Sequence, residues 1–144
     1  MQIKESTTYE QQIELFSLGM LSKFFADMPT ADRKELAGEM FGLNEKTVRS
    51  WLHCCTNLRN ICAHYGRLYF RLLGAIPATP SDFPARLNRS LYSALLMLKS
   101  MYPAKEKWNA VFLAELSALN NQYSEYIKLQ YIGFPDNWET ALQN

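Results

Sequence analysis

The chain has 144 residues, a length that suits one domain with a buried core, and we expect a single domain over residues 1–144. Hydrophobic residues make up 48% of it, and glycine and proline number six each, which argues against disorder and against a turn-rich β fold. The net charge of +1 excludes a strong overall attraction to polyanions. No apolar run is long enough to cross a bilayer, and the first residues do not resemble a signal peptide, so a cytoplasmic protein without a membrane partner is predicted.

Apolar residues at helical spacing, separated by proline and glycine stop signals, predict helices along most of the chain. The proline-rich residues 74–84 are predicted to form a loop. The tail is expected to turn at residues 133–135 and to end in one more helical turn from Asp136. The predicted helices span residues 8–27, 30–41, 45–65, 85–102 and 104–126, which indicates an all-α bundle of about five main helices.

Charge is distributed unevenly along the chain. Between Lys46 and Ser81 there is no Asp or Glu, although both histidines and several cationic residues fall in this stretch. Such a stretch predicts a local positive field that would suit a polyanion. The residues concerned are Lys46, Arg49, His53, Arg59, His64, Arg67 and Arg71.

The predicted third helix has two different faces on a helical wheel. One half is the apolar face of a bundle helix, and it is expected to bury its thiols rather than to pair them in disulfides or on zinc. The other half holds guanidinium, imidazole and amide groups without a carboxylate, and Arg67 and Arg71 would join it if the helix continued past Gly66. The apolar half comprises Val48, Trp51, Cys55, Leu58, Ile61, Cys62 and Tyr65, with Cys54 also on this helix; the polar half comprises His53, Thr56, Asn57, Arg59, Asn60 and His64.

The polar half would suit the cleavage of a phosphodiester. The guanidinium of Arg59 matches phosphate oxygens two at a time, and a histidine such as His64 can exchange a proton near neutral pH. Asn60 can hydrogen-bond the substrate or its catalytic neighbours. Because this helix has no cluster of Asp or Glu for a divalent ion, no metal or other cofactor is expected. The remaining route is attack by a neighbouring 2′-hydroxyl, which predicts RNA rather than DNA as the substrate.

Transfer in line with the leaving group needs both a general base and a general acid. The helix offers one well-placed histidine, His64, while His53 lies three turns away and is a weaker second candidate that we place among the RNA-binding residues. A two-fold dimer would bring two Arg–His sets together. We therefore expect a homodimer to be required for activity.

Three segments of the chain resemble a known family. The spacing of Arg59 and His64 is similar to the ribonuclease motif of the HEPN superfamily, and residues 58–71 (LRNICAHYGRLYFR) resemble the signature of Abi-like, or abortive-infection, proteins. Residues 16–25 (FSLGMLSKFF) and 132–138 (IGFPDNW) resemble other parts of that family. Family members are often about twice as long as this chain, and the resemblance is to their C-terminal half.

The resemblance implies a HEPN-like helical bundle with a toxin-like role in phage defence. It also implies endoribonuclease activity that leaves a 2′,3′-cyclic phosphate. Arg59 would stabilise the transition state, His64 would be the general acid or base, and Asn60 would support them. Arg67 and Arg71 would position RNA. A cognate antitoxin or a regulatory RNA would be a further partner of such a protein.

Two other interpretations remain open from the sequence. Residues 36–52 read like a helix-turn-helix, with Gly42 at the turn and with Lys46, Thr47 and Arg49 free to contact DNA. Alternatively, the chain is a catalytically silent HEPN module that binds RNA or forms a structural dimer.

Overall fold

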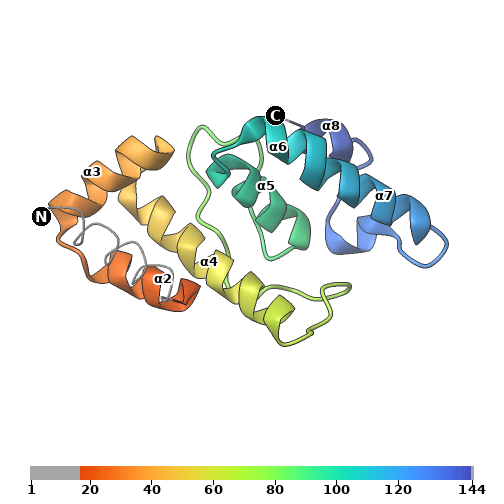
Figure 1. Cartoon of the computed structure of the whole chain (residues 1–144), viewed down its shortest axis with the longest axis horizontal. Helices are drawn as coiled ribbons and strands as arrows, with labels where there is room; N and C mark the ends of the chain where they lie inside the picture. Colours follow the sequence, from red (N-terminus) through yellow and green to blue (C-terminus); the bar gives the residue numbers. More distant parts are fainter. Residues whose placement is uncertain (1–16, 144) are drawn as a thin grey trace, which may run out of the picture.

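A computed structural model describes residues 17–143, and within this range the chain forms helices and loops but no strand (Figure 1). The all-α prediction is therefore confirmed. The first helix was expected to begin near residue 8, and that part of it lies outside the described residues. The elements are α2 (Leu18–Asp27), α3 (Thr30–Phe41), α4 (Glu45–Ala63), α5 (Leu91–Met101), α6 (Lys105–Lys107), the π-helical η1 (Trp108–Leu113), α7 (Ala114–Gln122), the 3-10 turn η2 (Leu129–Ile132) and α8 (Trp138–Leu142).

Side-chain caps set where the helices begin. The side-chain oxygens of Ser17, Asn44 and Ser90 accept hydrogen bonds from backbone N–H groups in the first turns of α2, α4 and α5. These bonds satisfy amides that have no partner inside a helix. At the other end of α3, Gly42 adopts a φ of 63°, a left-handed conformation that glycine tolerates without a Cβ clash.

Helix α4 is the central element of the fold. It packs against α2 and α3 on one side and against α5 on the other (Figure 1). Its buried residues reach three clusters in turn along its length. Val48 packs with Phe25 and Ala37, Trp51 and Cys54 belong to the largest cluster with Leu95, Met97, Trp138 and Leu142, and Ile61 packs with Leu73 and Ala94.

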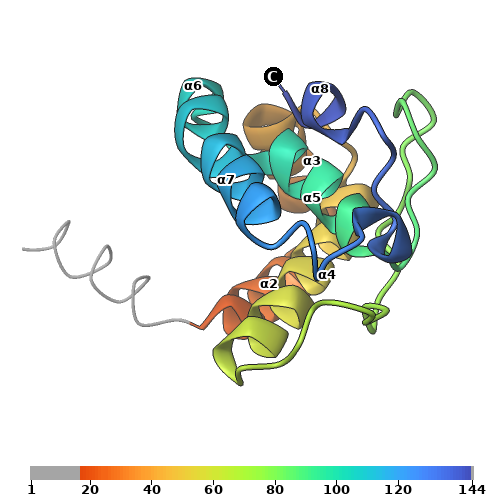
Figure 2. The same cartoon turned by 90° about the vertical axis from the view of Figure 1, so that its right-hand side faces the viewer.

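The segments α6, η1 and α7 form one continuous helical run, called here the α6–α7 rod, beside α5 (Figure 2). The rod contributes buried Trp108 to the fold, and its indole Nε1 donates to the Leu142 carbonyl at 2.8 Å. The sequence predicts this helix over residues 104–126, but it ends at Gln122, where the chain turns with the Tyr126 and Ile127 amides bonded to the Tyr123 carbonyl. No helix of residues 17–143 combines the length and hydropathy that a bilayer crossing requires.

The helix predicted over residues 85–102 begins six residues late, at Leu91. The preceding residues are held in a non-helical conformation by their own polar groups. The Asn88 amide donates to Ser93 Oγ at 3.0 Å, and Ser90 caps the helix. The Leu73 amide also donates to the Arg89 carbonyl at 2.9 Å, while Arg89 Nε donates back to the Leu73 carbonyl at 2.6 Å. These bonds compete with the helical pattern that the apolar spacing suggested.

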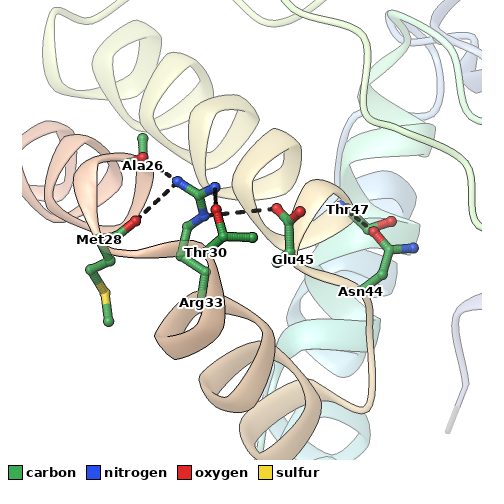
Figure 3. Close-up of polar contacts among 7 residues, drawn as sticks. All are labelled: Ala26, Met28, Thr30, Arg33, Asn44, Glu45 and Thr47. Carbon is green, nitrogen blue, oxygen red and sulfur yellow. Dashed lines mark hydrogen bonds and ion pairs between the residues drawn. The ribbon is translucent and has the colours of Figure 1, made fainter.

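A polar clip holds the N-terminal end of α4 against α2 and α3 (Figure 3). Arg33 Nη1 donates to the carbonyls of Ala26 at 2.6 Å and Met28 at 3.1 Å, and Nη2 donates to Thr30 Oγ1 at 3.1 Å. Its Nε lies 3.9 Å from the carboxylate of buried Glu45, the first residue of α4. The two charges compensate each other where water is largely excluded, which ties three helices together at one point.

Candidate functional site

The C-terminal end of α4 differs from the prediction in one important respect. The helix ends at Ala63 with His64 as its C-cap, because the chain reverses into a left-handed conformation at Tyr65 (φ 54°). The Tyr65 amide donates to the Cys62 carbonyl at 3.1 Å, and the Gly66 amide donates to the Ile61 carbonyl at 2.7 Å. This pair of bonds is a Schellman motif, with a tyrosine in the position that glycine usually occupies. Arg67 and Arg71 therefore do not extend the polar face of the helix.

Gly66 makes this sharp ending possible. A Cβ atom on residue 66 would lie 2.7 Å from the Ile61 carbonyl oxygen and 2.8 Å from Ile61 Cγ2, both closer than real Cβ contacts. A larger residue would have to move the last turn of α4. The tight approach places His64 at the outer end of the helix, where its side chain is exposed to solvent.

Arg59 and Asn60 lie in the last two turns of α4 and His64 is its C-cap, and all three residues are exposed. Arg59 Nη1 donates to Asn60 Oδ1 at 2.9 Å, so the amide holds one edge of the guanidinium. The other guanidinium nitrogens keep their hydrogens available for an anion. Among the described residues, none is recorded as a hydrogen-bond partner of the His64 ring. This end of α4 therefore presents a planar cationic fork and an imidazole to solvent.

His53 does not share this position. It lies eleven residues before His64, which on an α-helix corresponds to roughly 16 Å along the axis. Its surroundings form a separate hollow of about 510 Å³ between α2 and α4. Lys23, Lys46 and Arg49 line the same hollow, and no carboxylate does. His53 thus sits in a basic depression suited to a phosphate backbone, too far away to complete an acid–base pair with His64 of its own chain.

Two residues of the predicted polar face have structural contacts instead. Thr56 Oγ1 donates to the Leu52 carbonyl at 3.0 Å and lies 3.4 Å from the Leu18 carbonyl of α2. Asn57 Oδ1 accepts from the Gly74 amide at 3.0 Å, which fixes the loop after α4. Both side chains are half-buried. Part of the predicted polar face therefore packs against other segments, and the rest of it is exposed to solvent.

The loop that follows α4 separates the two arginines that the sequence grouped together. Arg67 is exposed directly after Gly66. Arg71 folds back toward the helix end, and its Nη1 lies 3.3 Å from the position that a Cβ on Gly66 would occupy. Arg71 also lines an open cavity of about 670 Å³, together with Phe70, Arg89 and Tyr131. Of these cavity residues, only Arg71 is predicted from the sequence as a site residue. Phe70 directly precedes Arg71, whereas Arg89 and Tyr131 come from distant parts of the chain and no local motif marks them.

The cysteines of α4 do not behave as one buried group. Burial raises the pKa of the Cys54 thiol to about 11, with a further contribution from neighbouring Cys55. Burial likewise raises the pKa of Cys55 to about 11. Cys62 was expected on the buried face but is exposed, whereas the adjacent Ile61 is buried against Leu73 and Ala94. All three thiols are free, and no group of three or more metal-ligating side chains occurs within residues 17–143.

The DNA-binding interpretation places Thr47 on a recognition surface, but this residue is only 4% exposed. It lies in the first turn of α4 near the Arg33–Glu45 clip (Figure 3). The side chain of Thr47 is therefore packed inside the protein and is not free to contact DNA. Only Lys46 and Arg49 of the proposed contact residues are exposed.

Comparison with known proteins adds one finding. No curated protein and no solved structure shows significant similarity to the chain. One family model matches the N-terminal part of the chain and does not reach residues 132–138. This match does not support the expectation that the chain resembles the C-terminal half of the family's members, and it gives no information on the HEPN superfamily. Residues 8–70, which include α2, α3, α4 and the candidate residues up to Arg67, match the family described as Abi-like protein.

Proposed function

We propose that the protein is a metal-independent endoribonuclease of the HEPN type that acts in abortive infection. The observation that carries this proposal is the exposed group at the end of α4, where Arg59 is bonded to Asn60 beside His64. The Abi-like match over residues 8–70 supports the biological role, because it includes the helix that bears this group.

The reaction assigns one task to each group. The 2′-hydroxyl oxygen of a nucleotide attacks the adjacent phosphorus, forming the 2′,3′-cyclic phosphate, while the bond from phosphorus to the 5′-oxygen breaks. His64 in its neutral form accepts the proton of the 2′-hydroxyl. Arg59 binds the equatorial phosphate oxygens, where negative charge is concentrated as the transition state forms. Asn60 keeps the guanidinium in orientation through its side-chain oxygen.

The leaving 5′-oxygen also requires a proton. Each chain presents one histidine at the end of α4, because His53 is about 16 Å away along the helix. A second copy of the chain can supply a protonated His64 from the opposite side of the phosphate. The nearly complete exposure of Tyr65, at 98%, leaves an aromatic side chain next to His64 that a second copy could cover. We therefore include a homodimer in the proposal.

The proposal is tested by incubating labelled single-stranded RNA with purified protein in EDTA. The wild type, Arg59→Ala and His64→Ala are compared, with exposed Arg86→Ala as the matched control. Loss of the acid–base group is expected to slow cleavage by about 100- to 10,000-fold, while Arg86→Ala cleaves like the wild type. The products should carry 2′,3′-cyclic phosphate ends. Equal degradation of RNA by all four proteins would contradict the assignment.

A separate experiment tests whether the active site requires two copies of the chain. If two copies form one site, the rate per chain should fall on dilution, in parallel with dissociation measured by sedimentation. A rate per chain that stays constant while the protein is monomeric would show that one copy is sufficient. His53→Ala then becomes informative, because a monomeric enzyme needs another source for the second proton.

A second candidate function is RNA binding without cleavage. The hollow lined by Lys23, Lys46, Arg49 and His53 favours it, because four cationic or titratable side chains face one depression without a carboxylate. Under this alternative, RNA binds in EDTA with an affinity that falls steeply as salt rises, and no cleavage products form.

A further inference from the structure

The open cavity beside the end of α4 is not explained by the proposed reaction. It measures about 670 Å³ and lies where the loop after α4 meets the start of α5 and the η2 turn. Its size falls in the range of small-molecule and nucleotide sites. The walls come from three separated segments, namely residues 70–72 with Ile76, residues 88–90, and residues 130–133.

Two exposed aromatic rings stand in this cavity. The side chains of Phe70 and Tyr131 are 63% and 65% exposed, and their rings stack with centroids 5.4 Å apart at an interplanar angle of 23°. Phe70 has a φ of 57°, a left-handed backbone conformation that non-glycine residues rarely adopt. The Tyr69 hydroxyl accepts from the Lys128 amide at 3.0 Å, which anchors the same loop to the chain before η2. The two rings are therefore fixed by contacts with each other and by the anchored loop, and both remain exposed to solvent.

The polar part of the cavity is positive. Arg71 and Arg89 line it, and none of its lining residues is Asp or Glu. Arg89 is fixed by its Nε bond to the Leu73 carbonyl at 2.6 Å, which leaves its terminal nitrogens for another partner. A flat apolar surface beside two guanidinium groups matches a ligand with a planar ring and a phosphate.

The floor of the cavity depends on a glycine. Gly133 has a φ of 90°, and a Cβ on it would lie 2.6 Å from Ser90 Cβ. This close approach brings the η2 turn against the first residues of α5, so that Tyr131 and Arg89 line the same cavity. The three walls are thus brought together by backbone geometry.

Arg71 connects this cavity with the candidate catalytic group. Its Nη1 lies 3.3 Å from the Cβ position of Gly66, two residues after His64, and the same side chain lines the cavity. A strand whose phosphate contacts Arg71 could therefore place one nucleotide in the cavity and a neighbouring one at the end of α4.

We propose that this cavity binds one nucleotide of single-stranded RNA, with the base stacked on the outer face of the Phe70–Tyr131 ring pair and the phosphate held by Arg71 and Arg89. The choice of RNA as the ligand rests on the proposed function. Stacking on an aromatic ring tolerates any base, so the cavity would determine where the strand lies rather than which sequence is cut. A paired base could not reach the rings, which predicts a preference for single strands over duplexes.

The test measures binding separately from cleavage. Fluorescein-labelled single-stranded RNA is titrated with His64→Ala protein in EDTA, and anisotropy gives the dissociation constant. Tyr131→Leu removes the aromatic face but keeps an apolar side chain against Phe70, whereas Tyr131→Phe keeps the ring. Tyr126→Leu is the matched control, because Tyr126 is 76% exposed and lies outside the cavity.

We expect Tyr131→Leu to weaken binding by about ten-fold, and Tyr131→Phe and Tyr126→Leu to bind as the parent does. Arg89→Lys should weaken binding as well, since lysine lacks the planar fork. Thermal unfolding checks that each variant is folded. Equal affinity of Tyr131→Leu and Tyr126→Leu, or equal binding of single-stranded and duplex RNA by the parent, would overturn the proposal. Ring-dependent binding by a wild type that does not cleave RNA would support the cavity while refuting the nuclease.

Discussion

The two ends of α4 use polar residues in opposite ways. At the N-terminal end, Glu45 and Thr47 are 8% and 4% exposed, and Arg33 and Asn44 contact them in a network that joins three helices (Figure 3). At the C-terminal end, Arg59, Asn60 and His64 are exposed, and the chain turns through a strained conformation.

The difference teaches which end can bind a ligand. Polar groups that are buried and mutually satisfied stabilise the fold, and removing one leaves its partner without compensation. Polar groups that are exposed contribute little to stability, so their spacing on α4 needs another reason. Variants at the first end should therefore change the free energy of unfolding, and variants at the second should change activity.

The largest expected change in stability is for Arg33→Met. This substitution removes the bonds to Ala26, Met28 and Thr30 and leaves the Glu45 carboxylate with no cation beside it. We expect the free energy of unfolding to fall by about 2–4 kcal/mol, measured by urea denaturation. Arg86→Met, which removes an exposed arginine outside the clip, is the control. A loss below that of the control would show that the clip does not hold the helices together.

Gly66→Ala tests the opposite end of α4. The added Cβ would lie 2.7 Å from the Ile61 carbonyl, so the last turn must move, and we expect a loss of about 1–3 kcal/mol in urea denaturation. Gly38→Ala is the matched control, because nothing lies within 4 Å of the new Cβ inside α3. That substitution should stabilise the protein by about 0.5–1 kcal/mol. Equal effects of the two changes would mean that the end of α4 is not tightly packed.

Tyr65→Gly should act in the stabilising direction. Glycine removes the cost of the left-handed conformation at φ 54°, which we place at about 1 kcal/mol. Because Tyr65 is almost fully exposed, little packing is lost. If thermal unfolding shows a gain in stability while cleavage falls, the tyrosine serves the site or the dimer. A loss of stability would indicate that its side chain packs in the folded protein.

The reactivity of the three thiols compares the middle of α4 with its C-terminal end without any substitution. With pKa values of about 11, Cys54 and Cys55 are about one part in a thousand thiolate at pH 8, and their thiolate fraction rises about ten-fold per pH unit until the pH nears 11. Iodoacetamide should therefore modify exposed Cys62 first, at one site per chain by mass spectrometry. Rapid modification of Cys54 in the native protein would show that the middle of α4 opens to solvent.

Prediction from sequence succeeded where local signals agreed. The start of α4 at Glu45 follows from Asn44, whose short side chain caps a helix wherever it precedes one. The same holds for the end of α3 at Gly42. Helical spacing also predicted that Arg59, Asn60 and His64 lie away from the apolar face of α4, and all three residues are exposed.

Prediction failed where a distant contact overrides a local preference. The helix expected from residue 85 begins at Leu91 because Arg89 pairs with Leu73, sixteen residues earlier. The Ser90 cap and the bond from Asn88 to Ser93 are local, but the pairing of Arg89 with Leu73 is not encoded in a window of neighbouring residues.

The sequence by itself determined that the chain is helical, where α3 ends, where α4 begins and that the polar face of α4 holds no carboxylate, because each depends on residues within one or two turns. Only the tertiary structure decided that Arg71 returns to Gly66 and that Phe70, Arg89 and Tyr131 share one cavity. The physical reason is that these residues meet through hydrogen bonds and ring contacts between segments up to sixty residues apart, and such contacts form only when the whole chain has folded.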